Sequence, residues 1–215
     1  MFELTFKLCD TMTEDIRNPC VVVPIYAEDP KHYTTETLDI GCGAGERFTT
    51  VERAGVSVDL AKPDKKLENF VKASVENLPF KEDTFRCVTM FDVIEHVENP
   101  TRSIREVHRV LKEKGNFLMG TPNCMYLLST FMIMLRGMYV LTTPNNTYGV
   151  DADHVSTWGP PEMHNLLQRG GFKHFKITPY TYRDKPHKFL PRLLLKLPWR
   201  GLTARQILVT ARKQN

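Results

Sequence analysis

The sequence has no apolar run long enough to cross a membrane as a helix. Its longest apolar stretch, residues 125–141, is interrupted by Arg136 and Gly137, and only 11 residues without charge precede Arg136. A spanning helix needs about 20 apolar residues, so we expect an interfacial or substrate-binding segment here. The amino-terminal sequence MFELTFKLCD is too short and too interrupted by charge for a signal peptide. These absences favour a cytoplasmic protein.

Cysteine and histidine spacing typical of a zinc site is also missing. There is no CxxC motif, and the odd number of cysteines predicts free thiols in a reducing cytoplasm. The five are Cys9, Cys20, Cys42, Cys87 and Cys124. No internal repeat typical of a solenoid or propeller is present. With 215 residues, 41% hydrophobic and 25% charged, the composition excludes a disordered chain and predicts one domain over residues 1–215.

Acidic residues are missing from the C-terminal part of the chain. Residues 185–215 carry eight Lys or Arg and no Asp or Glu, which leaves 21 basic and 25 acidic residues in 1–184. A basic segment suits an anionic partner, such as an acidic amphiphile, a membrane surface or a nucleic acid. The net charge of the whole chain is only +4 and no separate RNA-binding module is recognisable, which argues against nucleic acid.

Short apolar runs alternate with helical patterns from residue 38 onward. Runs typical of buried strands lie at 38–40, 56–58, 70–73, 85–91, 116–120, 172–177 and 206–211, and an alternating run lies at 2–8. Helical patterns lie at 46–53, 101–112 and 161–169. The alternation predicts βαβ units and a mostly parallel sheet, in which ligands bind beyond the carboxyl ends of the strands.

A glycine loop, GCGAGE, follows the first of these strands at residues 41–46. Its three glycines allow a tight turn and let a ligand approach the main chain. A dinucleotide-binding loop has glycine where this sequence has Glu46, and an acid there suits a pyrophosphate poorly. Asp39, just before the loop, suits a cationic amino or sulfonium group. Asp59, at the end of the next strand, suits a ribose diol.

Several motifs together resemble the class I S-adenosylmethionine-dependent methyltransferases. In order, they are LDIGCGAG, VSVDL, ASVENLPFKEDTFRCV, FDVIEHVENP, REVHRVLKEKGNFLMGTPN and GGF. The resemblance covers residues 37–180 and is closest to the small-molecule and ubiquinone-biosynthesis-like branch. It implies an α/β fold with a doubly wound, Rossmann-like sheet of seven strands, mostly parallel with an antiparallel last strand. It also implies S-adenosyl-L-methionine as cofactor and S-adenosyl-L-homocysteine as product.

The resemblance implies that Asp39 and the glycine loop hold the methionine end of the cofactor, and that Asp59 holds the ribose hydroxyls. The family often has an Asp for the adenine amino group where this chain has Ser74, so the backbone at Val75 is expected to serve instead. The cofactor contacts implied in this way involve Asp39, Gly41, Cys42, Gly43, Gly45, Asp59, Leu60, Ser74, Val75, Met90 and Phe91.

Asp92, Glu95 and His96 follow the fourth strand, where the methyl group would be delivered, and three interpretations stay open. These side chains hydrogen-bond the loop, as polar groups at strand ends usually do. Alternatively, His96 is a general base, with Glu95 and His154 as further candidate catalytic residues. A metal site of Asp92, Glu95 and His96 with Asp153 or His154 is the third. It resembles the ExxEH pattern of metal-dependent methyltransferases, but Asp92 shortens the reach, so no metal is expected.

Two long segments are predicted to be lids or substrate segments. Residues 124–160 contain four of the nine methionines, and methionine-rich surfaces adapt to apolar partners. Residues 181–205 interleave leucine with Lys and Arg, which suits an amphiphilic acidic substrate or an anionic membrane surface. For both segments, packing against the protein's own core is the alternative.

The sequence therefore predicts an enzyme that transfers a methyl group by in-line displacement to a small or amphiphilic acceptor, including a lipid-linked one. We expect it in the cytoplasm, with peripheral contact to a membrane surface. One alternative is an RNA methyltransferase, with or without a metal ion. Another is a protein that binds S-adenosylmethionine without catalysis.

Overall fold

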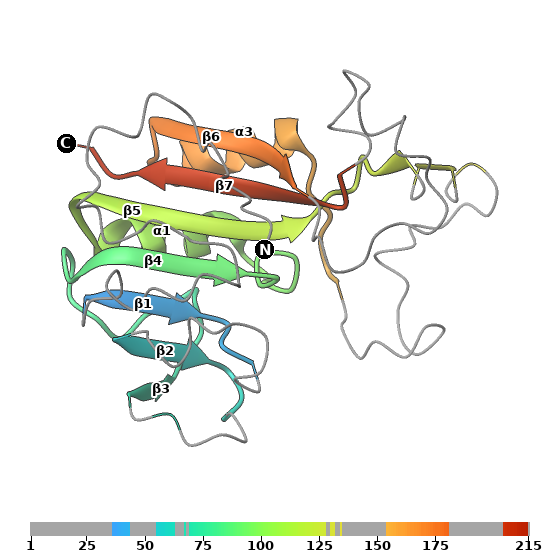
Figure 1. Cartoon of the computed structure of the whole chain (residues 1–215). Coiled ribbons are helices and arrows are strands. Elements are labelled where there is room, and N and C mark those ends of the chain that lie inside the picture. Colours follow the sequence, from blue (N-terminus) through green and yellow to red (C-terminus); the bar gives the residue numbers. More distant parts are fainter. Residues whose placement is uncertain are drawn as a thin grey trace, which may run out of the picture.

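Seven strands among the described residues form one mixed sheet in the computed structural model of this protein (Figure 1). They are β1 (Thr37–Ile40), β2 (Val56–Asp59), β3 (Phe70–Lys72), β4 (Phe85–Phe91), β5 (Leu111–Pro122), β6 (His174–Tyr180) and β7 (Gln206–Arg212). Their order across the sheet is β3-β2-β1-β4-β5-β7-β6. The structure describes residues 36–43, 55–62, 67, 69–127, 130, 131, 134, 154–180 and 204–214.

Strands β1 to β5 are paired in parallel, whereas β7 is antiparallel to both β5 and β6. The predicted α/β class, a mostly parallel sheet of seven strands with an antiparallel last strand, is confirmed. Because β1 to β5 point the same way, their carboxyl ends meet at one edge of the sheet, and β7 begins at that edge (Figure 1). The loops that follow these ends can therefore form one site.

Helices α1 (Pro100–Val110) and α3 (Pro160–Arg169) pack together on one face of the sheet (Figure 1). Each helix has proline in its first turn, where no backbone donor is needed. The Asn99 side chain caps α1 by accepting the backbone N–H of Arg102 (3.0 Å). Apolar residues of α1 recur at helical spacing and are buried, namely Ile104, Val107 and Val110. This stripe holds α1 on the sheet.

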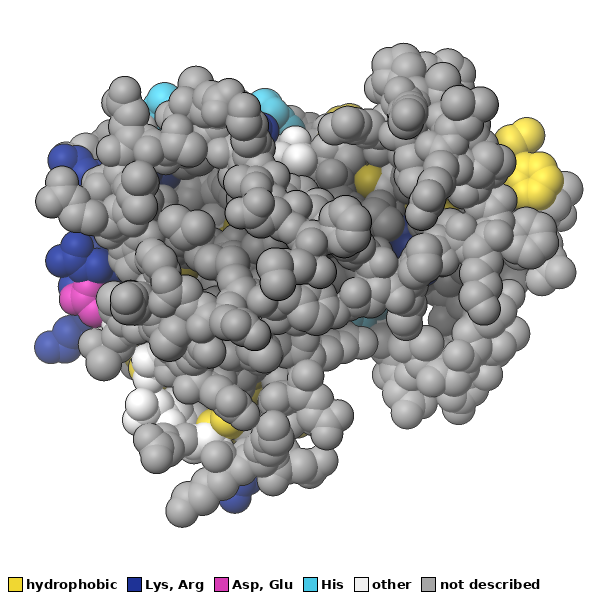
Figure 2. All heavy atoms as spheres, in the orientation of Figure 1, with side chains coloured by type: hydrophobic (Ala, Val, Ile, Leu, Met, Phe, Trp, Pro, Cys, Tyr) yellow, Lys and Arg dark blue, Asp and Glu magenta, His cyan; other side chains and the backbone are white. Residues whose placement is uncertain are grey.

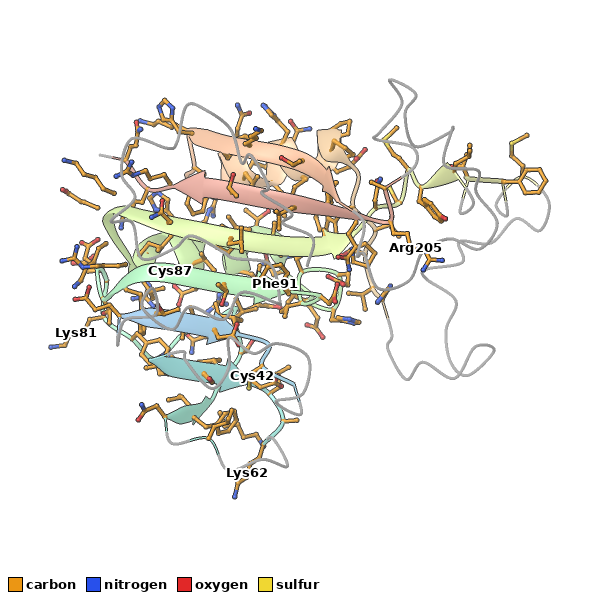
Figure 3. The ribbon with its side chains drawn as sticks, viewed as in Figure 1. Cys42, Lys62, Lys81, Cys87, Phe91 and Arg205 are labelled. Carbon is orange, nitrogen blue, oxygen red and sulfur yellow. The ribbon has the colours of Figure 1, made fainter. Side chains whose placement is uncertain are left out.

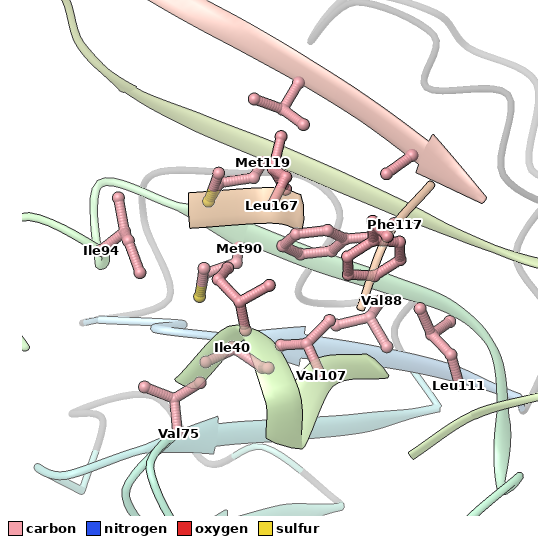
Figure 4. Packing of buried hydrophobic residues seen from close by; sticks show 14 of the residues in the cluster. Ile40, Val75, Val88, Met90, Ile94, Val107, Leu111, Phe117, Met119 and Leu167 are labelled. Carbon is pink, nitrogen blue, oxygen red and sulfur yellow. The ribbon is translucent and has the colours of Figure 1, made fainter. Parts of the chain in front are cut away.

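The hydrophobic core includes residues from this helical layer and the sheet (Figure 4). Phe117 of β5 and Phe172, just before β6, stack with ring centroids 5.5 Å apart. Both rings are almost completely buried, and burial of such a side chain contributes about 1.5–3 kcal/mol. Met90 of β4 has no exposed surface and belongs to this cluster. The structure therefore places Met90 in the core rather than in the lining of the cavity.

The boundary between α1 and β5 differs from the prediction, and β6 covers residues 174–180 rather than 172–177. Helix α1 ends at Val110 rather than at residue 112, and β5 begins at Leu111 rather than at residue 116. Leu111 is fully buried and pairs with Phe85 of β4. A buried leucine at this position satisfies helical and strand patterns equally, so the periodicity alone could not separate them. The predicted strand 2–8 and helix 46–53 lie outside the described residues.

The helices of the described part include none long and apolar enough to cross a membrane.

Cys42 and Cys124 carry free thiols, as predicted. Cys87 is disulfide-bonded, so the prediction of a free thiol at this position is wrong. The described strands all belong to one sheet. A single domain over residues 1–215 stays a prediction, because much of the chain lies outside the described ranges.

Candidate functional site

Two glycines after β1 form the described part of the glycine loop. Gly41 has φ +77° and donates its N–H to the carbonyl of Val58 in β2 (2.8 Å). A Cβ at Gly41 would lie 2.0 Å from Cγ2 of Val93, so only glycine fits there. Gly43 has φ +55°, and none of the described atoms lies within 4 Å of its ideal Cβ position. The main chain at Gly43 is therefore open to a ligand, and Gly45 lies outside the described residues.

Asp59, at the end of β2, anchors this loop. Its Oδ2 accepts the N–H of Gly43 (2.8 Å), and its Oδ1 accepts the N–H of Ala61 (3.0 Å). The residue is partly exposed, and an ionised carboxylate offers about four lone-pair sites. Both oxygens therefore retain the capacity to accept a ligand hydroxyl while they hold the loop.

A cavity of about 550 Å³ lies where β1, β2 and β4 end. In Figure 3, Cys42 and Phe91 mark this edge of the sheet. Most of the predicted cofactor-binding residues line the cavity, namely Gly41, Cys42, Gly43, Asp59, Leu60, Ser74, Val75 and Phe91. Asp92 and His96 of the predicted catalytic segment line it as well. The volume is in the range of sites for small molecules and cofactors.

Glu76, which the sequence argument did not assign, ties the segment after β3 to the start of α1. Its Oε1 accepts the backbone N–H groups of Glu98 and Asn99, both at 3.0 Å. Ser74 Oγ in turn accepts the N–H of Glu76 (3.1 Å), so the Ser74 hydroxyl is oriented by the main chain. Leu60, also in the cavity lining, is 67% exposed and provides an apolar surface for a flat ring.

Asp39 of β1 is buried just before the glycine loop and does not line the cavity. Thr89 of β4 donates its hydroxyl to Oδ1 (2.6 Å), while Oδ2 is buried with no partner among the described residues. Burial raises the pKa of Asp39 to about 6; the Thr89 hydrogen bond lowers it and the negative charge of Asp59 raises it. A buried carboxylate oxygen without a donor suits a cationic ligand group.

Glu95, His96 and His154 come together next to the cavity, although His154 is distant in the sequence. One imidazole nitrogen of each histidine and one carboxylate oxygen of Glu95 all lie within 4.8 Å of one another, and the two rings meet edge to face with centroids 4.7 Å apart. Glu95 is 2% exposed, and its Oε2 accepts the hydroxyl of Thr121 in β5 (3.0 Å). His96 is exposed and lines the cavity, so of the three it is the one placed to reach a substrate.

The position of His154 follows from two backbone hydrogen bonds. The N–H groups of Val155 and Ser156 donate to the Glu95 carbonyl, at 2.9 and 3.1 Å. The returning chain is thereby attached to the loop that carries Glu95 and His96. Asp92 lies outside the three-residue group, and Asp153 lies outside the described residues.

Polar residues within or at the ends of the strands hold the acids of the site, and the sequence argument missed them. Thr89 donates to Asp39 and Thr121 donates to Glu95. Gln206, at the start of β7, donates from Nε2 to Oδ1 of Asp92 (3.1 Å). For Thr89 and Thr121, the detectable signal was a polar residue among apolar ones, which needs a partner once it is buried.

The methyltransferase domain family matches residues 22–176 of this chain. The chain therefore belongs to the class I S-adenosylmethionine-dependent methyltransferases. An S-adenosylmethionine-dependent methyltransferase of Thermotoga maritima has the same fold, with a TM-score of 0.61, 20% identity, and coverage of 83% of this chain and 82% of that one.

Two curated relatives are similar in sequence. An uncharacterised protein of Methanocaldococcus jannaschii is 35% identical over 108 residues, which are 47% of this chain and 43% of the relative. This chain thus spans less than half the length of that relative. A ubiquinone biosynthesis O-methyltransferase of Coxiella burnetii is 23% identical over 166 residues, which are 71% of this chain and 69% of that enzyme.

Proposed function

We propose that this protein transfers a methyl group from S-adenosylmethionine to a small or amphiphilic acceptor. The observation that carries the proposal is one cavity lined both by the glycine loop with Asp59 and by His96. The Coxiella relative is named for ubiquinone biosynthesis, and ubiquinone joins a polar ring to a hydrophobic chain. An acceptor of that general character fits the apolar and polar groups around this cavity.

The described residues fit S-adenosylmethionine. The open backbone at Gly43 is proposed to take its methionine end, the unpartnered Oδ2 of Asp39 to favour its positive charge, and Asp59 to accept its ribose hydroxyls. Ser74 and the backbone of Val75 would contact the adenine beside the exposed Leu60. When bound, the cofactor supplies a methyl group on a sulfonium leaving group.

Protonation of Asp39 is predicted to weaken binding of this cationic cofactor. A positive charge nearby favours the ionised carboxylate, and Asp39 has a pKa of about 6 in the free protein. Binding therefore releases a proton at low pH, and the dissociation constant should rise about tenfold between pH 7.5 and pH 5. Calorimetry in two buffers with different ionisation enthalpies measures both quantities.

Asp39→Asn is the variant that isolates this effect. Its dissociation constant should change little over the same pH range, because the carboxamide does not titrate. Thr89 can still donate to the carboxamide oxygen.

The raised pKa means that Asp39 favours the folded state at low pH, a contribution lost as the pH rises through about 6. Asp39→Asn should therefore be no less stable than wild type at pH 7.5. An equally steep pH dependence in both proteins contradicts the assignment.

On the acceptor side, His96 is proposed to take the proton of an acceptor hydroxyl. The imidazole is the side chain best suited to accept a proton near neutral pH. Glu95, buried and held by Thr121, is proposed as a positioning residue that also favours the protonated imidazole. His154 would complete the wall next to His96. The remaining task is to hold the acceptor in line with the methyl group.

An exposed apolar helix face supports an amphiphilic acceptor. Leu127, Phe131 and Met134 are helical, and their spacing places them on one face. Their exposed fractions are 44%, 53% and 80%, and Figure 2 shows exposed hydrophobic side chains at this end of the molecule. Arg205 is exposed and lies over the Tyr126 ring at the base of this helix, 5.7 Å from its centroid. Apolar residues beside a cation suit contact with an anionic lipid surface that carries the acceptor.

Incubation with labelled S-adenosylmethionine and a fractionated cell extract tests the proposed function. Label should enter the lipid or small-molecule fraction with wild-type protein and should disappear with Asp59→Ala. Label confined to RNA would favour an RNA methyltransferase instead. Cofactor binding without label in any fraction would indicate a non-catalytic protein.

Metal-assisted transfer is the second candidate, favoured by the grouping of Glu95, His96 and His154. Two atoms that each bind one zinc ion at about 2.1 Å can be at most about 4.2 Å apart. The ligand atoms of these three side chains would therefore have to move closer together to bind one ion. The general-base proposal predicts that labelling proceeds at an unchanged rate after complete removal of metal with EDTA. Loss of activity that Mg²⁺, Mn²⁺ or Zn²⁺ restores would instead establish the metal site.

A further inference from the structure

Asn123, directly after β5, joins chain segments from three parts of the sequence. Its side chain is completely buried. Its backbone N–H donates to the Arg205 carbonyl (2.8 Å), and its Nδ2 donates to the Ala204 carbonyl (2.9 Å). Its Oδ1 accepts the N–H of Met125 (3.1 Å). Asn123 also pairs with Trp158 in a parallel bridge.

These partners are the described ends of the two predicted substrate segments. Met125 and Trp158 lie near the two ends of segment 124–160, and Ala204 and Arg205 end segment 181–205. The N–H of Cys124 donates to the Trp158 carbonyl (3.0 Å), which closes the base of the first segment. The carboxamide of Asn123 therefore holds the start of the first segment and the end of the second, and the main chain of Asn123 and Cys124 holds the end of the first segment at Trp158.

The same junction is connected to the cavity on both sides. Gln206, next to Arg205, donates to Asp92, which lines the cavity. Thr121, close before Asn123, donates to Glu95 beside His96. A displacement at Asn123 would therefore be transmitted to the acceptor side of the site, whereas the Asp59 loop lies beyond other strands of the sheet.

We propose that Asn123 is a positioning residue for acceptor recognition: it sets the described ends of the two segments, at Met125 and at Ala204 and Arg205, relative to His96, a role that rests on the proposed function. The chemistry is specific to a carboxamide, because one side chain must donate to Ala204 and accept from Met125 at once. Aspartate has no N–H for the Ala204 carbonyl and would bring a charge into a fully buried position. Alanine leaves both partners without their hydrogen bond.

The test compares two defined acceptors, a phenol that carries a prenyl chain and the same phenol without the chain. The ratio of their kcat/KM values does not depend on the fraction of folded enzyme. It should fall about tenfold or more in Asn123→Asp and Asn123→Ala, while the dissociation constant for S-adenosylmethionine stays within about twofold of wild type. Asn99→Ala, which removes the cap of α1, is the matched control and should leave the ratio unchanged.

An unchanged ratio in both Asn123 variants would overturn the inference. If the wild type binds S-adenosylmethionine but methylates neither phenol, the proposed acceptor class has failed, and the junction is then tested without an acceptor. The chain has two tryptophans, so Trp199→Phe leaves Trp158 as the sole reporter. Its emission should shift to longer wavelength with Asn123→Asp and not with Asn99→Ala; identical emission in all variants would overturn the positioning role.

Discussion

Asp59→Ala is expected to weaken S-adenosylmethionine binding by a factor of about 100 or more. The carboxylate anchors the glycine loop through Gly43 and holds the next turn through Ala61. We propose that it also accepts two ribose hydroxyls. A hydrogen bond to a charged group contributes about 1.5–3 kcal/mol, so loss of two such contacts alone costs about 3 kcal/mol or more. Loss of the loop anchor adds to that cost, because the loop must then be ordered on binding.

Calorimetric titration of the free protein with S-adenosylmethionine measures this effect without an acceptor. Asp59→Asn should be intermediate, because its carboxamide oxygen still accepts one backbone N–H but its amide group cannot accept a hydroxyl proton. Asp83→Ala is the control. Asp83 is an exposed acid in the turn before β4, at the opposite edge of the sheet, and its partner is Lys213. Wild-type affinity in Asp59→Ala would show that the ribose is bound elsewhere.

The sheet could be predicted from the sequence because its strands are apolar and well separated by turn signals. Phe85–Phe91 was predicted to the residue from a run that alternates at its start, where Arg86 is exposed, and is continuously buried over residues 87–90. The same property limited the site prediction. Met90 and Phe91 are neighbours on opposite faces of β4, and a strand covered on both faces gives no sign of which residue turns to the cavity. Only Phe91 does so.

Spacing identified the acids of the site but not the groups that hold them. Asp59 was assigned from its place after the second strand, which topology alone determines. The buried Glu95 accepts a hydrogen bond from Thr121 of β5, and Asp92 accepts one from Gln206 of β7. Both are pairings between distant parts of the chain, set by strand order and register. A single sequence carries the polar residues but not the register that pairs them.

His96→Ala is expected to lower kcat for a hydroxyl acceptor by a factor of about 10²–10⁴, the usual contribution of a positioned general base. The substitution removes the imidazole that lines the cavity and leaves the Asp59 loop untouched. The dissociation constant for S-adenosylmethionine should therefore stay within about twofold of wild type. Labelled methyl transfer to the prenylated phenol, with calorimetry on the same preparation, measures both quantities.

Glu95→Gln tests whether the negative charge of Glu95 supports His96 as a general base, because the variant removes the charge and keeps the loop. The carboxamide oxygen still accepts the Thr121 hydroxyl, so the loop is retained, but the charge that favours a protonated His96 is gone. We expect kcat to fall about tenfold, because the positive charge that develops on His96 as it takes the proton then has no counter-charge beside it. His164→Ala is the matched histidine control, because His164 lies on α3 against Phe175 and outside the cavity lining. Equal kcat in His96→Ala and His164→Ala would show that His96 only shapes the loop, and that the acceptor loses its proton without help from this side chain.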